Sequence, residues 1–528
     1  MRRLAMLALA SATSVVLLSG CGRNPGTHAT GPQGTPDARA SAGQKAFEKA
    51  RTLYFQGNTN GAIDVLSAAM NDKACSDEKP VIFRGILELL LMSDRIQEAQ
   101  ARYLAALQTD ERSAESTFGM IENFLRSKKD DKALLGWTSQ LSGLSLPKGL
   151  QEKVSAAHLD ANLSAGKFDV VLAMVPQVAK QFGAPASARM FGGVVSSLIG
   201  SGNDDQLGQI LSAIRAVAGG SPELTDLVTC SEIRRLAARQ AWDQAVERFT
   251  LDARGIQDSS LHACLASLAS AAIGGGKFDA AEKVCAYVLK NLADKKNTWE
   301  RAADISADVA DKKSDPAGVA ACFVDLRALN VPAEVVLRSY SRLFYKTMGQ
   351  GSPQARASLM STGDWLMSQL QDKNARDQVQ AMLMDGAVLG DDYVRALKIL
   401  KDGYRATEKE WYDMALNKVE AHLALQQGRK EEAVERFRRF MEHVKTWTET
   451  TTDPASGMIY TKEMSLGMNA KRIGDILASM EKKDDARKAY AEADQYFKEA
   501  LAATQPDSKE AEFIKKEQAG LNAATAAK

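Results

Sequence analysis

The side chains best suited to acid–base or metal chemistry are few in this chain and lie far apart. The histidines are His28, His158, His262, His422 and His443. None of them belongs to an HExxH motif or stands at metal-ligand spacing from a cysteine. The sequence has no GxSxG elbow and no GxGxxG loop after a strand. We therefore predict no enzyme, no cofactor and no metal site.

One glycine-rich segment, Gly274-Gly275-Gly276-Lys277, faintly resembles a phosphate-binding loop. It lacks a further glycine at the required distance upstream, and Phe278 stands where a Ser or Thr would bind the metal. The segment also coincides with a turn of the repeat described below. We therefore interpret it as a structural turn.

The cysteines allow two alternatives. Besides Cys21 the chain has Cys75, Cys230, Cys264, Cys285 and Cys322. Buried free thiols are the first expectation, and Cys285 and Cys322 lie one repeat apart at equivalent positions. A disulfide between Cys264 and Cys285 is the alternative, because the two face each other across one predicted helix pair, and the N-terminal residues described next predict export to an oxidising environment.

The N-terminal residues follow the order of an export signal. Met1-Arg2-Arg3 is basic, Leu4 to Leu18 is an apolar run of 15 residues, and Leu18-Ser19-Gly20-Cys21 follows. This ending resembles the bacterial lipobox. The resemblance implies a signal peptide over residues 1–20, cleavage between Gly20 and Cys21, and a diacylglycerol on the Cys21 thiolate. Two or more acyl chains would then hold the protein stably to a membrane.

The segment after Cys21 predicts a flexible linker over residues 21–43. It is rich in Gly, Pro, Thr, Ala and Ser and cannot bury enough apolar surface to fold. An ordinary signal peptide or an uncleaved anchor fits less well, because the apolar run is short for a bilayer span. Gly22, where an Asp would favour the inner membrane in enterobacteria-like systems, points to the outer membrane, facing the periplasm or exposed at the surface.

From residue 44 to residue 505 the chain has a helical pattern interrupted by short polar breaks. These breaks lie near Gly57, Ser93, Lys128, Gly166, Gly202, Gln240, Gly276, Lys313, Gln350, Gly390 and Gly428, with a last one near Lys483. The spacing from Gly57 to Gly428 averages about 37 residues, which is typical of stacked helix pairs. A small residue such as Ala62 follows five residues after a break. Larger apolar seam residues come four positions later, at Leu66, Val175, Phe249, Cys285, Ile399 and Phe437.

Segments such as Gly276-Lys277-Phe278-Asp279-Ala280-Ala281 resemble the turn between the two helices of a tetratricopeptide repeat. The resemblance implies an all-α fold, an α-α solenoid or right-handed superhelix of about twelve hairpins, with a concave groove for a protein or peptide. The repeats are longer than the family's 34 residues, and other α-α solenoids are the alternative. The groove residues cannot be assigned, because the register of the first helices is open.

Two segments depart from the repeat. Residues 445–462 form an irregular insertion, which contains a polar stretch from Trp447 to Pro454. Long loops are often functional, but we interpret this one as a surface loop. Residues 506–528 are predicted to form a capping helix and tail, with the helix at about 508–521.

Charge and composition exclude some classes of partner. Lys plus Arg is 67 and Asp plus Glu is 66, so the net charge of +1 gives no reason to bind nucleic acid. Aromatic residues make up only 6% of the chain, which argues mildly against a sugar-stacking surface.

The function predicted from the sequence is a non-catalytic scaffold of the cell envelope. Its lipid anchor on Cys21 would hold it to the membrane while the repeats bind an envelope protein or peptide, in the assembly or export of an envelope complex. The alternative is a surface nutrient- or glycan-binding lipoprotein of the starch-utilisation type.

Overall fold

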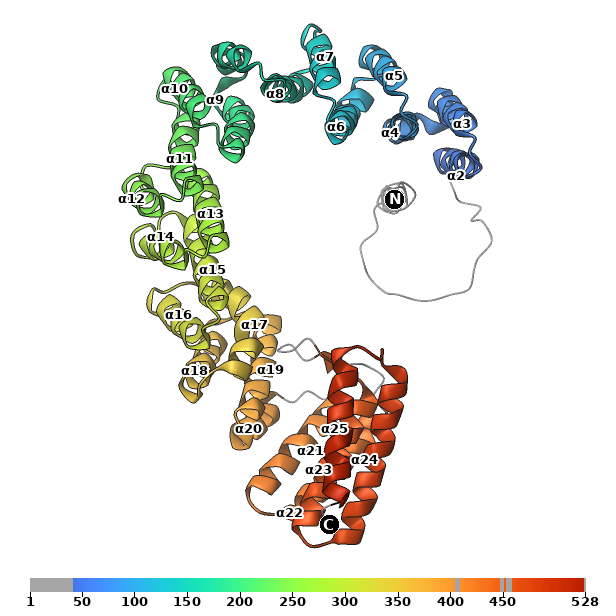
Figure 1. Cartoon of the computed structure of the whole chain (residues 1–528), viewed down its shortest axis with the longest axis vertical. Coiled ribbons are helices and arrows are strands. Elements are labelled where there is room, and N and C mark those ends of the chain that lie inside the picture. Colours follow the sequence, from blue (N-terminus) through green and yellow to red (C-terminus); the bar gives the residue numbers. More distant parts are fainter. Residues whose placement is uncertain (1–40, 404–408, 447–450, 453–457, 527–528) are drawn as a thin grey trace. The chain divides into compact units, whose positions relative to one another are not determined.

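The computed structural model describes residues 41–403, 409–446, 451–452 and 458–526, which are almost entirely helical (Figure 1). The predicted signal peptide, Gly20, Cys21 and nearly all of the linker lie outside the described residues. The chain divides into two compact units, Met1–Ser231 and Glu232–Lys528, a division that the sequence did not predict. The boundary falls inside helix α11 (Pro222–Ala238).

The elements of the first unit, before α11, are α2 Ala42–Phe55, α3 Thr59–Asn71, the 3-10 helix η1 Lys73–Glu78, α4 Lys79–Met92, α5 Ile96–Thr109, α6 Glu111–Ser127, α7 Asp131–Ser142, α8 Lys148–Ser164, α9 Phe168–Ser201 and α10 Asp204–Val217. Those of the second unit, after α11, are α12 Trp242–Asp252, α13 Asp258–Gly274, α14 Phe278–Asn291, α15 Lys296–Lys312, α16 Pro316–Ala328, α17 Ala333–Gln350, α18 Pro353–Gln369, α19 Lys373–Leu389, α20 Tyr393–Gly403, α21 Lys409–Gln426, α22 Lys430–Thr446, β1 Thr451–Thr452, β2 Ile459–Tyr460, α23 Lys462–Ser479, α24 Lys483–Ala503 and α25 Lys509–Ala526.

The predicted fold class is confirmed: the described residues form an all-α array of antiparallel helix pairs. Helices α2 to α24 make twelve pairs when α9 is counted as two helices, and α25 follows as a final helix after the last pair. Gly183 divides α9, because its φ of 74° and ψ of 174° are not helical. The second helix of one pair therefore runs without a loop into the first helix of the next.

One turn geometry closes nearly every pair. At the first turn the N–H of Gly57 donates to Tyr54 O at 2.9 Å, and the N–H of Asn58 donates to Leu53 O at 2.9 Å. This Schellman arrangement needs one residue with positive φ. Such a residue ends the first helix in eleven of the described pairs, at Gly57, Asp94, Lys129, Gly166, Gly202, Gln240, Gly276, Ser314, Asp391, Gly428 and Glu481. The pair α17–α18 differs, since Gly351 there has a φ of −78°.

The left-handed residue of each turn sets the register of the helix that follows. Five residues after it comes a buried residue: Ala62, Ala99, Leu134, Val171, Leu207, Ala245, Ala281, Val319, Ala396, Ala433 and Ala486. Nine residues after it comes a second: Leu66, Tyr103, Thr138, Val175, Leu211, Phe249, Cys285, Phe323, Leu400, Phe437 and Tyr490. The offset of four keeps both on one helix face, which packs into the core.

This rule corrects one predicted seam residue. Ile399 was expected in the core, nine residues after Gly390, but it is only half-buried, and Leu400 takes the position at 4% exposure. The reason is that Asp391, and not Gly390, adopts the positive φ of this turn, at 58°. Aspartate tolerates the left-handed region better than most residues with a Cβ, so the turn and the helix after it move by one residue.

Helices of successive pairs form two layers in the second unit (Figure 1). The first-helix layer comprises α13, α15, α17 and α19, each in contact with the next. In the second-helix layer α12 contacts α14, and α16 contacts α18. Each pair thus buries its apolar face against its neighbours, as stacked repeats must.

Helices α21 to α25 share a hydrophobic core of their own within this unit. The described part of the 445–462 insertion contains the two-residue strands β1 and β2, which pair antiparallel. Ile459 N–H donates to Glu510 Oε1 of α25 at 3.0 Å, so the insertion is tied to the final helix. No helix among the described residues combines the length and apolarity that crossing a bilayer requires.

Candidate functional site

The histidines of the described residues do not form a metal site, and no group of three His, Cys, Asp or Glu side chains in this part of the chain is placed to hold an ion. His158 Nδ1 lies 3.0 Å from Thr138 Oγ1, and its Nε2 lies 3.2 Å from Asn162 Nδ2. Burial, followed by the charge of Lys167, lowers the pKa of His158. This imidazole is therefore a neutral link between two helices.

The glycine-rich segment is a repeat turn, as the sequence indicated. Gly276 has a φ of 68°, and the N–H of Lys277 donates to Ala272 O at 2.7 Å. Its backbone donors near the first helix are thus already engaged in closing that helix.

The structure places the predicted cysteine pair in the core as separate thiols. Cys264 on α13 and Cys285 on α14 are both buried and free, so the structure does not contain the alternative disulfide. Burial raises the pKa of Cys285 to about 12 and that of Cys322 to about 12. Both groups are protonated at neutral pH and react slowly as nucleophiles.

Thiol titration tests this assignment. The purified, unfolded mature chain is expected to give five reactive thiols, from Cys75, Cys230, Cys264, Cys285 and Cys322. In the native state the buried thiols should react more slowly, because a reagent reaches them only when the array opens locally. A count of three thiols that rises to five after a reductant is added would establish the disulfide instead.

Charged side chains on the first-helix layer mostly neutralise one another. Glu300 and Asp311 of α15 pair with Arg338 and Lys346 of α17, at 3.6 and 2.6 Å. Between these pairs Arg342 of α17 bridges to an acid of α15 in the same way. These contacts are partly exposed and stabilise the array little.

Lys418 of α21 departs from this pattern of ion pairs between neighbouring first helices. Lys418 has no hydrogen bond or ion pair to another described residue, and its ammonium lies 5.8 Å from the Phe440 ring centroid. The nearby Asp385 accepts a hydrogen bond from Tyr345 Oη at 2.8 Å. Lys418 is exposed to solvent, yet the protein around it lowers the pKa of its ammonium. Burial raises the pKa of Asp385, while its hydrogen bond with Tyr345 and the charge of Lys418 act to lower it.

Arg472 of α23 and His422 of α21 continue this positive surface. Arg472 Nη1 donates to His422 Nε2 over 3.0 Å, and its Cζ lies 5.7 Å from the Phe437 ring centroid. No described carboxylate pairs with the guanidinium. The imidazole stacks on Tyr393 with centroids 4.9 Å apart. Burial, then the charges of Arg472 and Lys418, lower the pKa of His422 to about 4, so it is neutral at pH 7.

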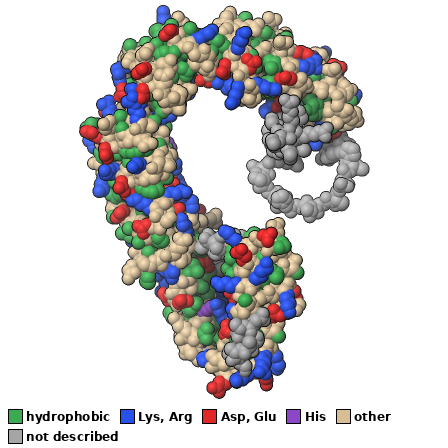
Figure 2. Space-filling view, viewed as in Figure 1, with side chains coloured by type: hydrophobic (Ala, Val, Ile, Leu, Met, Phe, Trp, Pro, Cys, Tyr) green, Lys and Arg blue, Asp and Glu red, His purple; other side chains and the backbone are tan. Residues whose placement is uncertain are grey.

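Lys418, His422 and Arg472 form what we term the basic cluster. The stacking of His422 on Tyr393 places the cluster where α21 meets α20, while Figure 2 shows basic and acidic side chains interspersed over the visible face. A lysine and an arginine without acid partners, beside aromatic rings, match an anionic group such as a carboxylate. Neutral His422 accepts from Arg472 and orients the guanidinium.

Comparison with models of protein families gives no match, and comparison with curated protein sequences gives none either. Solved structures that match are helical-repeat proteins. The chain is similar to yeast Tom70, with 10% identity, 91% of this chain and 96% of that chain covered, and a TM-score of 0.23. The structure of Naa15/Naa10 bound to HypK-THB matches with 13% identity, 91% and 78% coverage, and a TM-score of 0.25.

A third match is the APC/C hetero-tetramer Cut9–Hcn1, with 10% identity, 91% and 96% coverage, and a TM-score of 0.20. These TM-scores are too low for the matches to carry an argument about function. The assignment to the tetratricopeptide-like solenoids therefore rests on the helix pairs, their common turn and their buried positions in this chain.

The sequence did not reveal the basic cluster. Lys418 and His422 share a helix face at a spacing of four, a signal that was visible but not distinctive. Arg472 follows His422 by 50 residues because the insertion separates their pairs, which hides the relation from a search at the repeat period.

Proposed function

We propose that this chain is a non-catalytic scaffold that is tethered to a membrane of the bacterial cell envelope and binds an acidic segment of a protein partner. The observation that carries the binding proposal is the basic cluster, in which neither Lys418 nor Arg472 forms an ion pair with a described carboxylate. Both side chains are exposed, so a carboxylate of the partner can reach them and accept charge-assisted hydrogen bonds from them.

The envelope location is supported by the lipobox-like ending at Cys21 and by the linker that follows it. We propose lipidation of Cys21, removal of residues 1–20 and attachment to the outer membrane, facing the periplasm. A body carried on such a linker samples a volume near the membrane surface, which favours capture of an envelope partner in the assembly or export of a complex.

In vivo crosslinking of the full chain in its native host tests the proposal. Lys418→Ala combined with Arg472→Ala should lower recovery of the crosslinked partner at least tenfold, because two charge-assisted hydrogen bonds are lost. The matched control is Arg487→Ala with Lys488→Ala on α24, which removes the same two residue types from exposed positions. The control should leave recovery unchanged.

The same crosslink should weaken as salt is raised, because the contacts are partly exposed charges. Circular dichroism of both double variants must match that of the unmodified chain. Equal recovery from the two variants would refute binding at the basic cluster, and recovery of glycan alone would refute the scaffold.

A further inference from the structure

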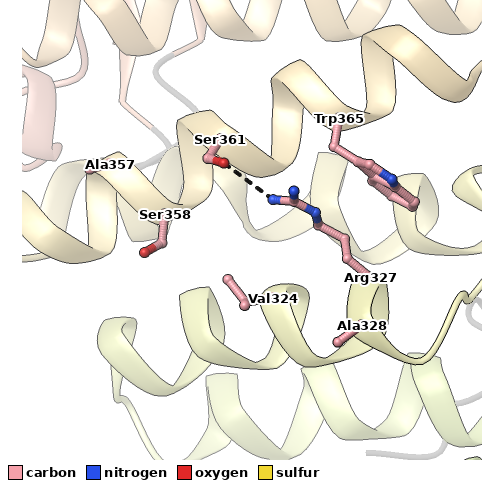
Figure 3. Close-up of a pocket in the computed structure, with 7 residues that line it drawn as sticks. All are labelled: Val324, Arg327, Ala328, Ala357, Ser358, Ser361 and Trp365. Atoms are coloured by element: carbon pink, nitrogen blue, oxygen red, sulfur yellow. Dashed lines mark hydrogen bonds between the residues drawn. The ribbon is translucent and has the colours of Figure 1, made fainter.

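A second hollow lies in the second-helix layer, between α16 and α18 (Figure 3). Its volume is about 600 Å³, within the range of ligand sites, and it is open to solvent. Arg327 and Val324 of α16 line one side, and Ser361 and Trp365 of α18 line the other. The hollow belongs to a different layer from the basic cluster and is formed by the second helices of two successive pairs.

Arg327 is the charged group of this hollow. Its Nη1 donates to Ser361 Oγ at 3.3 Å, and its Cζ lies 5.6 Å from the Trp365 ring centroid (Figure 3). A guanidinium has five N–H donors in a fixed fork, and within the described part of the chain this one hydrogen bond is the only one that engages them. Its remaining donors are available, while Ser361 and the indole ring of Trp365 hold the group in place.

No acid of the described ranges pairs with this guanidinium. Asp364, the acid next to Trp365 in sequence, accepts two hydrogen bonds from Arg395 Nη2, at 2.8 and 2.9 Å. Arg327 itself forms no ion pair with any described carboxylate. The hollow therefore carries a net positive charge at its centre.

The remaining wall is apolar and accessible. Val324 is 42% exposed, and Ala328 and Ala357, which also line the hollow, are exposed. Aliphatic surface next to a guanidinium fits a ligand that has a carboxylate and an aliphatic side chain a few ångströms apart. Neighbouring acidic and aliphatic residues of a peptide provide this combination.

We propose that the hollow is a second binding site, which takes an acidic–aliphatic peptide segment of a protein partner. A side-chain carboxylate of the segment accepts two hydrogen bonds from the Arg327 fork, and an adjacent aliphatic side chain covers Val324. Trp365 packs against the guanidinium and keeps its fork directed into the hollow. The two sites would let one chain hold two segments, on different layers of the array.

Fluorescence anisotropy on the purified full chain tests the site. The probe is a short labelled peptide of alternating Leu and Glu, blocked at both ends. The control peptide is identical except that Gln replaces Glu. The protein carries Lys418→Ala with Arg472→Ala, so that failure of the basic cluster cannot affect the result. Arg327→Gln should weaken binding of the Glu peptide at least tenfold. Arg487→Gln is the matched control, because the Arg487 side chain on α24 is exposed, and it should have no effect on binding.

Trp365→Leu should weaken binding by a smaller factor, because the fork loses its support but keeps its charge. Each of the following three outcomes would overturn the proposal. Equal affinity for the Gln peptide would show that the carboxylate is not recognised. Displacement of the Glu peptide by inorganic phosphate at an equal concentration would assign the site to free anions. Binding of a maltooligosaccharide that Arg327→Gln leaves unchanged would assign it to sugars.

Discussion

Cys21→Ser is expected to abolish lipid labelling of the protein and to release it from the membrane. The serine hydroxyl cannot form the thioether, and the described helices offer no bilayer span to replace it. Cells fed an alkyne-tagged palmitate should label the unmodified chain and leave the variant unlabelled. Membrane and soluble fractions, separated after a carbonate wash, should show the protein moving to the soluble fraction.

The repeat array should be unaffected by this change, since Cys21 lies before the first described helix. Circular dichroism of the released variant should match that of the unmodified chain. Cys75→Ser is the matched control, because it removes a free cysteine of the body and should leave labelling and membrane attachment intact. If Cys21→Ser remains labelled and stays with the membrane, the anchor proposal is wrong.

Gly474→Leu is expected to destabilise the α23–α24 pair by about 3 kcal/mol, the upper end of typical overpacking costs. The two helices approach closely here, and a Cβ on Gly474 would lie 2.5 Å from Tyr490 Cε1. Tyr490 cannot move away freely, since it is buried and its Oη donates to Asp475 Oδ1 at 2.7 Å. Leucine favours the helix more than glycine, but by only about 1 kcal/mol.

Urea unfolding followed by circular dichroism and by hydrogen exchange of α23 and α24 measures this loss. Gly193→Ala on α9 is the matched control, because no atom lies within 4 Å of its Cβ position. That substitution should stabilise the chain by about 0.5–1 kcal/mol through the lower entropy of the unfolded state. A Gly474→Leu chain as stable as the unmodified one would mean that the two helices are not packed this closely.

Much of the fold could be predicted from the sequence, because the repeat imposes the same physical requirement at each period. A break, a small residue after five positions and a larger one after nine recur at Gly57, Ala62 and Leu66, and these positions form the seam in the structure. The predicted turn position was Gly390, one residue before Asp391, which has the positive φ. Glycine is the residue most often expected in the left-handed conformation, so the sequence favoured Gly390. Two neighbouring residues can each accept the left-handed conformation, and packing decides between them.

The candidate site was much less accessible to sequence reasoning. Lys418 and Arg472 are ordinary surface residue types, and only the arrangement of helices shows that neither has an acid partner. Arg327 and Trp365 are 38 residues apart on successive second helices. That relation could have been found from the period, but the hollow between them depends on how far apart the helices stand. Pairing across repeats is a property of packing, which a local pattern does not encode.

The common left-handed turn also bears on how such a chain changes length over evolution. The turns at Gln240 and Gly276 have the same geometry and lie 36 residues apart. Excising the residues from one to the other would rejoin α11 to α14 through an equivalent junction, with Ala281 and Cys285 replacing Ala245 and Phe249 in the seam. Duplication of the same stretch would insert a pair with both of its neighbours already compatible. A gene of this kind can therefore gain or lose whole periods by recombination, and each event alters the number of surfaces on offer without requiring a new core.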